Sequence, residues 1–156
     1  MTPNDGPVDG HARFDQLSAA VRESGPGDDQ ALIAALLAEP DRLMAESVLT
    51  SLVDSRAERL GSAASLTAWA EPLLDAVGDD GFIARRVREW SLFKALQSGA
   101  SVDREALAAA SNWLQRKVVE EADSAVVLTV LGEVARTKRM RNLAKTRAGR
   151  LRSAAR

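Results

Sequence analysis

The C-terminal end of the chain concentrates side chains that could bind anions. Residues 136–156 hold nine basic side chains and no acidic one, namely Arg136, Lys138, Arg139, Arg141, Lys145, Arg147, Arg150, Arg152 and Arg156. The whole chain has 21 Lys+Arg and 22 Asp+Glu, so residues 1–135 keep 12 bases against 22 acids. A body of formal charge −10 therefore carries a tail of +9, and such a tail needs an acidic counterpart or solvent.

Two interpretations of this basic tail stay open. If it binds nucleic acid, each phosphate that it neutralises steepens the salt dependence of binding by nearly one unit of log–log slope. Alternatively, it is a solubilising cap that suits the negative end of its helix dipole, or it folds back on the acidic body. The tail has no aromatic side chain for base stacking, and its apolar stripe is too weak for an amphipathic membrane helix.

Groups suited to catalysis are few. The only histidine, His11, lies near the start of the first expected helix, where we expect a solvated side chain rather than a general base. The chain has no cysteine, which excludes disulfides, thiolate zinc sites and thiol nucleophiles. It also lacks a Gly-x-Ser-x-Gly elbow and a phosphate-binding Gly-Lys-Ser/Thr loop. We therefore expect no catalytic residues, no metal site and no cofactor.

Adjacent carboxylates occur at three places, Asp28-Asp29, Asp79-Asp80 and Glu120-Glu121. Each pair lies at a predicted helix start. A carboxylate there accepts hydrogen bonds from free backbone N–H groups and favours the positive end of the helix dipole. Capping explains all three pairs, so we assign them no metal-binding or acid–base role.

Apolar side chains recur at spacings of three and four along most of the chain, which predicts amphipathic helices and an all-α fold. The helices are expected over about 12–23, 28–37, 41–60, 66–77, 82–97, 103–119 and 123–134, the last of which can continue into the basic segment. Pro72 lies inside one of them and predicts a kink.

The domain organisation follows from composition. Residues 1–10 hold two prolines and two glycines and are predicted to be a disordered leader. Residues 11–137 form the helical domain, and residues 138–156 form a basic C-terminal helix or tail. No apolar run is long enough to cross a membrane, so we expect a soluble, cytoplasmic protein. The abundance of Ala and Arg is typical of a GC-rich bacterial genome.

The helices are spaced as a repeat. Acidic turns at residues 39–41, 79–81 and 121–123 are each followed by comparable apolar positions. The leading positions are Met44, Ile83 and Val126, which lie 39 and 43 residues apart. Helical repeats of about 40–47 residues with two helices each are typical of HEAT and armadillo proteins.

The stretch Pro72-Leu73-Leu74-Asp75-Ala76-Val77-Gly78-Asp79-Asp80, followed by Ile83, Val87 and Trp90, carries a resemblance to the HEAT-repeat family. It is similar to a proline-kinked first helix, an acidic turn and an apolar-striped second helix. The resemblance covers roughly residues 28–137. It implies a short right-handed HEAT-like α-solenoid of about three helix pairs plus an N-terminal helix, used as a scaffold or recognition surface. An irregular helical bundle is the alternative.

Aromatic and basic residues outside the tail supply further candidates. Trp69 and Trp90 continue apolar stripes and are expected in the core, whereas Trp113 is expected to be partly exposed. In stacked repeats equivalent helix faces align, so basic residues one repeat apart can share a surface. Pairing at i,i+4, such as Arg85 with Glu89 and Arg116 with Glu120, is the alternative. The candidate partner-binding residues outside the tail are Arg85, Arg86, Arg88, Trp113, Arg116 and Lys117.

Our leading interpretation is a non-catalytic recognition or scaffold protein that binds a protein partner through a helical-repeat face, with the tail as a second contact. A protein partner comes first because the acidic body would repel nucleic acid over most of its surface. The alternative is electrostatic nucleic-acid binding through residues 136–156 and the cluster of Arg85, Arg86 and Arg88. An enzyme acting on nucleic acid or a nucleotide has no supporting motif.

Overall fold

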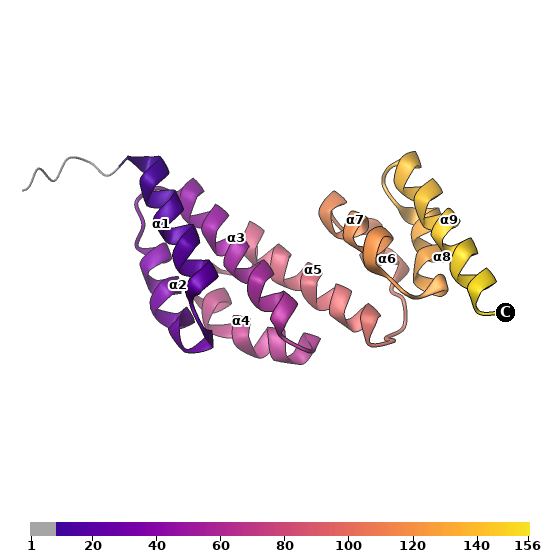
Figure 1. Ribbon diagram of the computed structural model, residues 1–156, viewed down its shortest axis with the longest axis horizontal. Helices are drawn as coiled ribbons and strands as arrows, with labels where there is room; N and C mark the ends of the chain where they lie inside the picture. The colour runs from indigo at the N-terminus through magenta and orange to yellow at the C-terminus, as the bar shows by residue number, and fades with distance from the viewer. Residues whose placement is uncertain (1–8) are drawn as a thin grey trace, which may run out of the picture. The chain divides into compact units, whose positions relative to one another are not determined.

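The computed structural model describes residues 9–156, without the side chain of Pro26 (Figure 1). Every regular element in this range is helical, which confirms the all-α prediction. The elements are α1 (Gly10–Glu23), the 3₁₀ turn η1 (Pro26–Asp28), α2 (Asp29–Leu37), α3 (Arg42–Arg59), α4 (Ala63–Val77), α5 (Phe82–Gln97), α6 (Arg104–Ala109), α7 (Asn112–Glu121), α8 (Ala125–Val134) and α9 (Lys138–Ala154). Residues 1–8 of the predicted leader lie outside the described residues, and Asp9 is already the N-cap of α1.

The described chain forms two compact units. The first consists of residues 9–61 and 68–87, and the second consists of residues 62–67 and 88–156. The division falls inside α4 and α5, so each of these helices contributes to both units.

The first unit is organised around a buried ion pair. The Arg56 guanidinium in α3 donates to both carboxylate oxygens of Asp29, at 2.8 and 2.7 Å, and each of the two residues is 3% exposed. The same guanidinium donates to the carbonyl and hydroxyl oxygens of Ser24, and the Trp69 indole N–H donates to Asp29 at 2.9 Å. One carboxylate thus joins α2, α3 and α4, and the guanidinium adds the end of α1.

This arrangement corrects the prediction that Asp29 serves as a capping residue. Its carboxylate is taken up by Arg56 and Trp69, whereas Asp28 accepts the Gly25 N–H in the turn before α2. The side-chain hydrogen bond from Asp29 raises the pKa of Arg56 above its ordinary value, against the opposing effect of burial. The guanidinium therefore stays charged over the pH range in which proteins fold, and its charge stays compensated within the core.

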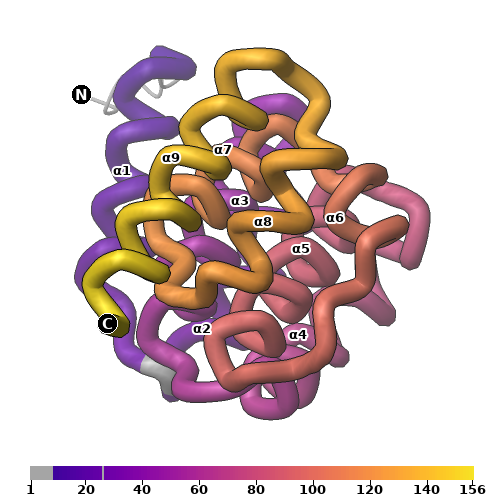
Figure 2. Tube along the Cα trace, turned by 90° about the vertical axis from the view of Figure 1, so that its right-hand side faces the viewer, coloured from indigo at the N-terminus to yellow at the C-terminus, as the bar shows by residue number. Residues whose placement is uncertain are grey.

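In the second unit, α6 and α7 each pack against the helix two positions further along the chain. Within it, α6 lies against α8 and α7 lies against α9, while α8 and α9 form an antiparallel pair (Figure 2). Leu107, Leu114 and Leu131 are fully buried in its core. The buried Gln115 side chain donates to the Leu107 carbonyl at 2.8 Å and accepts the Arg136 backbone N–H at 2.9 Å. It thereby ties α6 and α7 to the connection between α8 and α9.

The structure divides two segments that the sequence analysis treated as continuous. The helix predicted over 103–119 is α6 followed by α7, because Ser111 caps α7 and gives both its N–H and its hydroxyl to Glu89, each at 2.7 Å. The possible continuation of α8 into the basic segment is also wrong. Thr137 caps a separate helix there, with its hydroxyl accepting the Met140 N–H.

The predicted repeat register also needs correction. Ser124, not Asp123, caps α8, and Glu120-Glu121 ends α7 instead of starting a helix. As a result, Val127 and Leu128 face the core while Val126 is 66% exposed. Val126 is therefore not equivalent to the buried Ile83.

We expect Asp29→Asn to destabilise the protein by about 3–5 kcal/mol, because it leaves the Arg56 charge buried without a counterion. Asp54→Asn is the matched control. Its partner Arg86 is also held by two 2.8 Å bonds, but these side chains are 13% and 30% exposed, so the expected loss is about 1 kcal/mol or less. Urea denaturation followed by circular dichroism measures both. Equal losses for the two variants would contradict the role given to burial.

Candidate functional site

The basic helix α9 is held against the second unit by small residues. Ala144 and Ala148 lie on one side of α9 and are 0% and 1% exposed. Opposite them, α8 has Gly132, where an added Cβ would lie only 2.8 Å from Cγ of Lys145. The backbones of α8 and α9 therefore run close together, as both views show (Figures 1 and 2).

Three cations of α9 donate hydrogen bonds to neutral oxygens elsewhere in the unit. Arg141 donates to the Ala135 carbonyl at 2.7 Å, and Arg147 donates to the Val119 carbonyl at the end of α7. Arg152 donates to the Thr129 hydroxyl at 3.0 Å. These bonds fix the orientation of α9 without neutralising its charge, since none of the acceptors is a carboxylate.

The other cations of α9 point to solvent. Lys138, Arg139, Lys145 and Arg150 are exposed, as are Arg136 and Arg156 beside the helix. Ion pairs of the second unit include Arg104–Glu133 and Lys117–Glu121, and neither involves a residue of 136–156. No carboxylate of the second unit pairs with a residue of 136–156 in this described range, so the positive charge of α9 is not neutralised within its own unit.

The helix itself does not favour these charges. Its first turn contains Lys138 and Arg139 and no acidic residue, although this end of a helix dipole is positive. Lys138, Arg141 and Lys145 follow one another at spacings of three and four, where like charges repel. The first turn of α9 therefore has a charge pattern opposite to the one that the helix dipole favours.

The two units have formal charges of opposite sign. The second unit has 14 Lys and Arg against 7 Asp and Glu, a formal charge of +7. The first unit, over residues 9–61 and 68–87, has 7 against 14, a formal charge of −7. The acidic body assumed in the sequence analysis is therefore mainly the first unit, and the unit that carries α9 is itself basic.

The cluster of Arg85, Arg86 and Arg88 is divided between the units. Arg85 and Arg86 belong to the first unit, where Arg86 is bonded to Asp54 and Arg85 is exposed. Arg88 is an exposed residue of the second unit. The alternative pairing of Arg85 with Glu89 is not formed, because Glu89 accepts both hydrogen bonds from Ser111.

Trp113 and Lys117 belong to an aromatic cluster within the second unit. Trp113 packs 5.5 Å from the ring of Trp90, and Phe93 lies at 5.9 Å from the same ring. The Lys117 ammonium lies 4.4 Å from the Trp90 ring centroid and also pairs with Glu121, while Arg116 is exposed. Trp90 is 3% exposed, which confirms its predicted place in the core, and Trp69 is half-buried. Trp113 and Lys117 thus hold α7 against α5.

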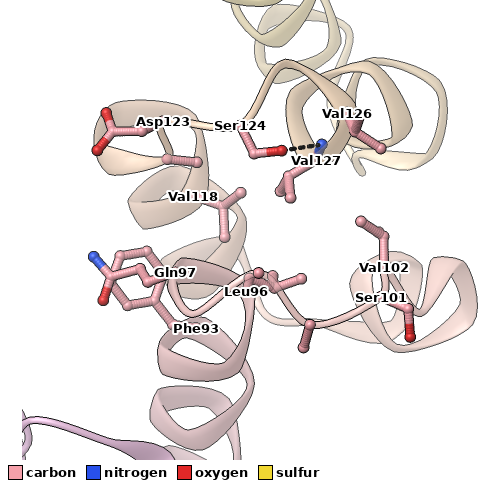
Figure 3. Close-up of a pocket in the computed structure, with 13 residues that line it drawn as sticks. Phe93, Leu96, Gln97, Ser101, Val102, Val118, Asp123, Ser124, Val126 and Val127 are labelled. Carbon is pink, nitrogen blue, oxygen red and sulfur yellow. Dashed lines mark hydrogen bonds between the residues drawn. The ribbon is translucent and has the colours of Figure 1, made fainter.

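A cavity of about 640 Å³ opens in the second unit between the end of α5, the following loop and the facing ends of α7 and α8 (Figure 3). Gly99, in the left-handed region at φ +84°, turns the chain from α5 into that loop. Leu96, Val118 and Val127 line the cavity, and Asp123 is its one charged lining residue. This lining is suited to apolar contact.

Ser91 and Lys94 have the Ser-x-x-Lys spacing of some serine hydrolases, a signal that the sequence analysis missed. They lie in the middle of α5. Lys94 is 8% exposed, with its ammonium 5.8 Å from the Trp90 ring centroid. Neither residue lines the cavity, so the geometry places Lys94 in the aromatic cluster without giving the pair a substrate site.

Comparisons with protein-family models, with curated proteins and with solved structures found no match to the chain. Within residues 9–156, no helix has the length and apolar character needed to span a membrane. The same residues contain no group of three or more His, Cys, Asp or Glu side chains placed to hold a metal ion.

Two glycines test the close packing of α9. Replacing a helix glycine with alanine normally stabilises a protein by up to about 1 kcal/mol. We expect this gain for Gly149→Ala, where an added Cβ meets nothing within 4 Å. For Gly132→Ala we expect a loss or no gain, because the methyl group would displace Lys145. Thermal unfolding compares the two variants, and an equal rise in Tm would contradict the close approach of α8 and α9.

Proposed function

We propose that this chain is a non-catalytic recognition protein that binds nucleic acid electrostatically through its second unit, with α9 as the principal contact. The observation that carries the proposal is the exposed positive charge of α9, which no carboxylate of the described second unit neutralises. Phosphates supply such counter-charges, and guanidinium groups suit them because they donate in a planar fork. Six of the eight cations at 138–156 are arginines.

The charge of the second unit supports the same proposal. Nucleic acid approaching this unit meets a net charge of +7, so long-range attraction adds to the contacts made by α9. This changes the order of the two interpretations drawn from the sequence, because the argument against nucleic acid rested on an acidic body surrounding the tail. The acidic excess belongs to the first unit.

For the architecture, we propose a HEAT-like right-handed α-solenoid. Its support is the packing of α6 on α8 and of α7 on α9, which is how consecutive helix pairs stack in a repeat protein. In that arrangement α6 and α7 form one helix pair, and α8 and α9 form the next. The sequence analysis expected a single pair over residues 103–134. A rigid stack of this kind presents a charged helix as a fixed surface.

A protein partner is the second candidate, favoured by the cavity in the second unit. Val126 lies at this cavity and is 66% exposed, so it adds apolar surface beside the apolar lining. A partner that buries an apolar side chain there would bind with little dependence on salt. Nucleic-acid binding would instead weaken steeply as salt rises.

The test of the proposed function is Lys138→Glu, with Arg42→Glu as its matched control. Both residues are exposed and occupy the first position of a helix, α9 and α3 respectively, and both exchanges change the charge by the same amount. Binding to a fluorescein-labelled oligonucleotide is measured by fluorescence anisotropy from about 50 to about 200 mM salt.

We expect Lys138→Glu to weaken binding several-fold and to make the log–log salt slope shallower by about one unit. Its Tm should stay the same or rise, since an acid in the first turn suits the helix dipole. Arg42→Glu should leave binding unchanged. An equal loss of affinity in both variants, or no binding of wild-type protein at low salt, would contradict the proposal.

A further inference from the structure

The exposed cations of α9 form two rows. At 100° per residue, Ala144, Ala148 and their half-buried neighbours Met140 and Leu151 define the side that packs on the unit. On one flank of the opposite side, Lys138 and Lys145 lie seven residues apart and form the first row, with about 10 Å between them along the helix.

The second row lies on the other flank and consists of Arg139 and Arg150, about 16 Å apart along the helix. Both residues are exposed. The two rows are separated by roughly a third of a turn around the axis. The surface between them is uncharged and consists of short side chains, namely Asn142, Thr146, Gly149 and Ser153.

A ligand that contacts both rows of cations must offer anions on both flanks of the helix. A single phosphate strand or an acidic peptide offers anions along one line, whereas a duplex groove has a phosphate backbone along each edge. A helix with its side chains is about 10–12 Å across. This width fits the major groove of B-DNA, which is about 12 Å wide, and exceeds the minor groove of about 6 Å.

We propose that α9 lies in the major groove of double-stranded DNA, with each cation row on the phosphates of one strand and the uncharged surface toward the base edges. This inference rests on the proposed function and specifies its substrate class. Duplex RNA fits less well, because its major groove is deep and narrow. Single strands also fit less well, since α9 has no aromatic side chain on which bases can stack.

The uncharged surface determines how closely α9 can enter the groove. Asn142 and Thr146 can exchange hydrogen bonds with base edges, and Gly149 adds no bulk. With so few polar side chains on this surface, sequence preference should be weak. The phosphates should supply most of the affinity.

The first experiment compares four probes in anisotropy titrations with the full chain. These are a mixed-sequence DNA duplex of about 20 bp, one of its strands, the RNA duplex of the same sequence, and polyglutamate as a competitor. We expect the DNA duplex to bind about tenfold or more tighter than the single strand and the RNA duplex, and polyglutamate to compete poorly. Equal affinity for the strand and the DNA duplex would overturn the groove assignment and leave the proposed function intact. Binding of polyglutamate without binding of any nucleic acid would overturn both.

The second experiment separates the rows from the surface between them. Lys145→Gln and Arg150→Gln should each lower the salt slope for duplex DNA by about one unit, and together by about two. Gly149→Leu keeps the charge and meets open space around its Cβ, yet its bulk would keep α9 out of the groove. It should weaken duplex binding about tenfold with little effect on the single strand.

Thr146→Leu is the second steric variant, at an exposed position where the fold is not affected. Circular dichroism at 222 nm confirms helicity for each variant. If both steric variants bind duplex DNA like wild type, α9 does not enter the groove. An effect of only one cation row would likewise overturn the arrangement, since a helix in a groove must contact both strands.

Discussion

The close contact between α8 and α9 determines which charges the second unit presents. Gly132 on α8 and the buried Ala144 and Ala148 on α9 let the two backbones approach closely. The side of α9 that carries the two alanines is therefore the side that packs on the unit. The cations beside that contact reach neutral oxygens on α7, α8 and the connection between α8 and α9, as Arg141 and Arg147 do. Lys138, Arg139 and Arg150 are exposed, so the positive surface is a consequence of how the helices pack.

The arginine side chains of the two units have different hydrogen-bond partners. In the first unit, Arg56 is buried and its charge is compensated by Asp29, with Ser24 and Trp69 completing the hydrogen bonds. Such a network specifies how four helices meet, and it leaves no charge for a partner. In the second unit, arginines of α9 donate to uncharged acceptors or to solvent. The first unit therefore contains a buried and compensated arginine, whereas α9 of the second unit leaves several basic side chains exposed.

Helix positions and the basic segment could be predicted from the sequence because both depend on local patterns. The breaks at Ser111 and Thr137 were missed because a single capping side chain overrides an otherwise continuous apolar spacing, although Ser-Asn and Thr-Lys at these places are recognisable capping signals. The role of Asp29 could not be predicted, since its partners lie 27 and 40 residues away. Which cations of α9 donate to neutral oxygens likewise depends on tertiary packing.

The most direct test of the account is a ¹H–¹⁵N NMR titration of the full chain with duplex DNA of about 20 bp at moderate salt. The account predicts that the largest amide shifts occur along α9, with Asn142, Thr146 and Gly149 between the cation rows among the most affected. Residues around Asp29 and Arg56 in the first unit should be unchanged. Shifts centred on Val126 and the cavity, or on the first unit, would contradict it.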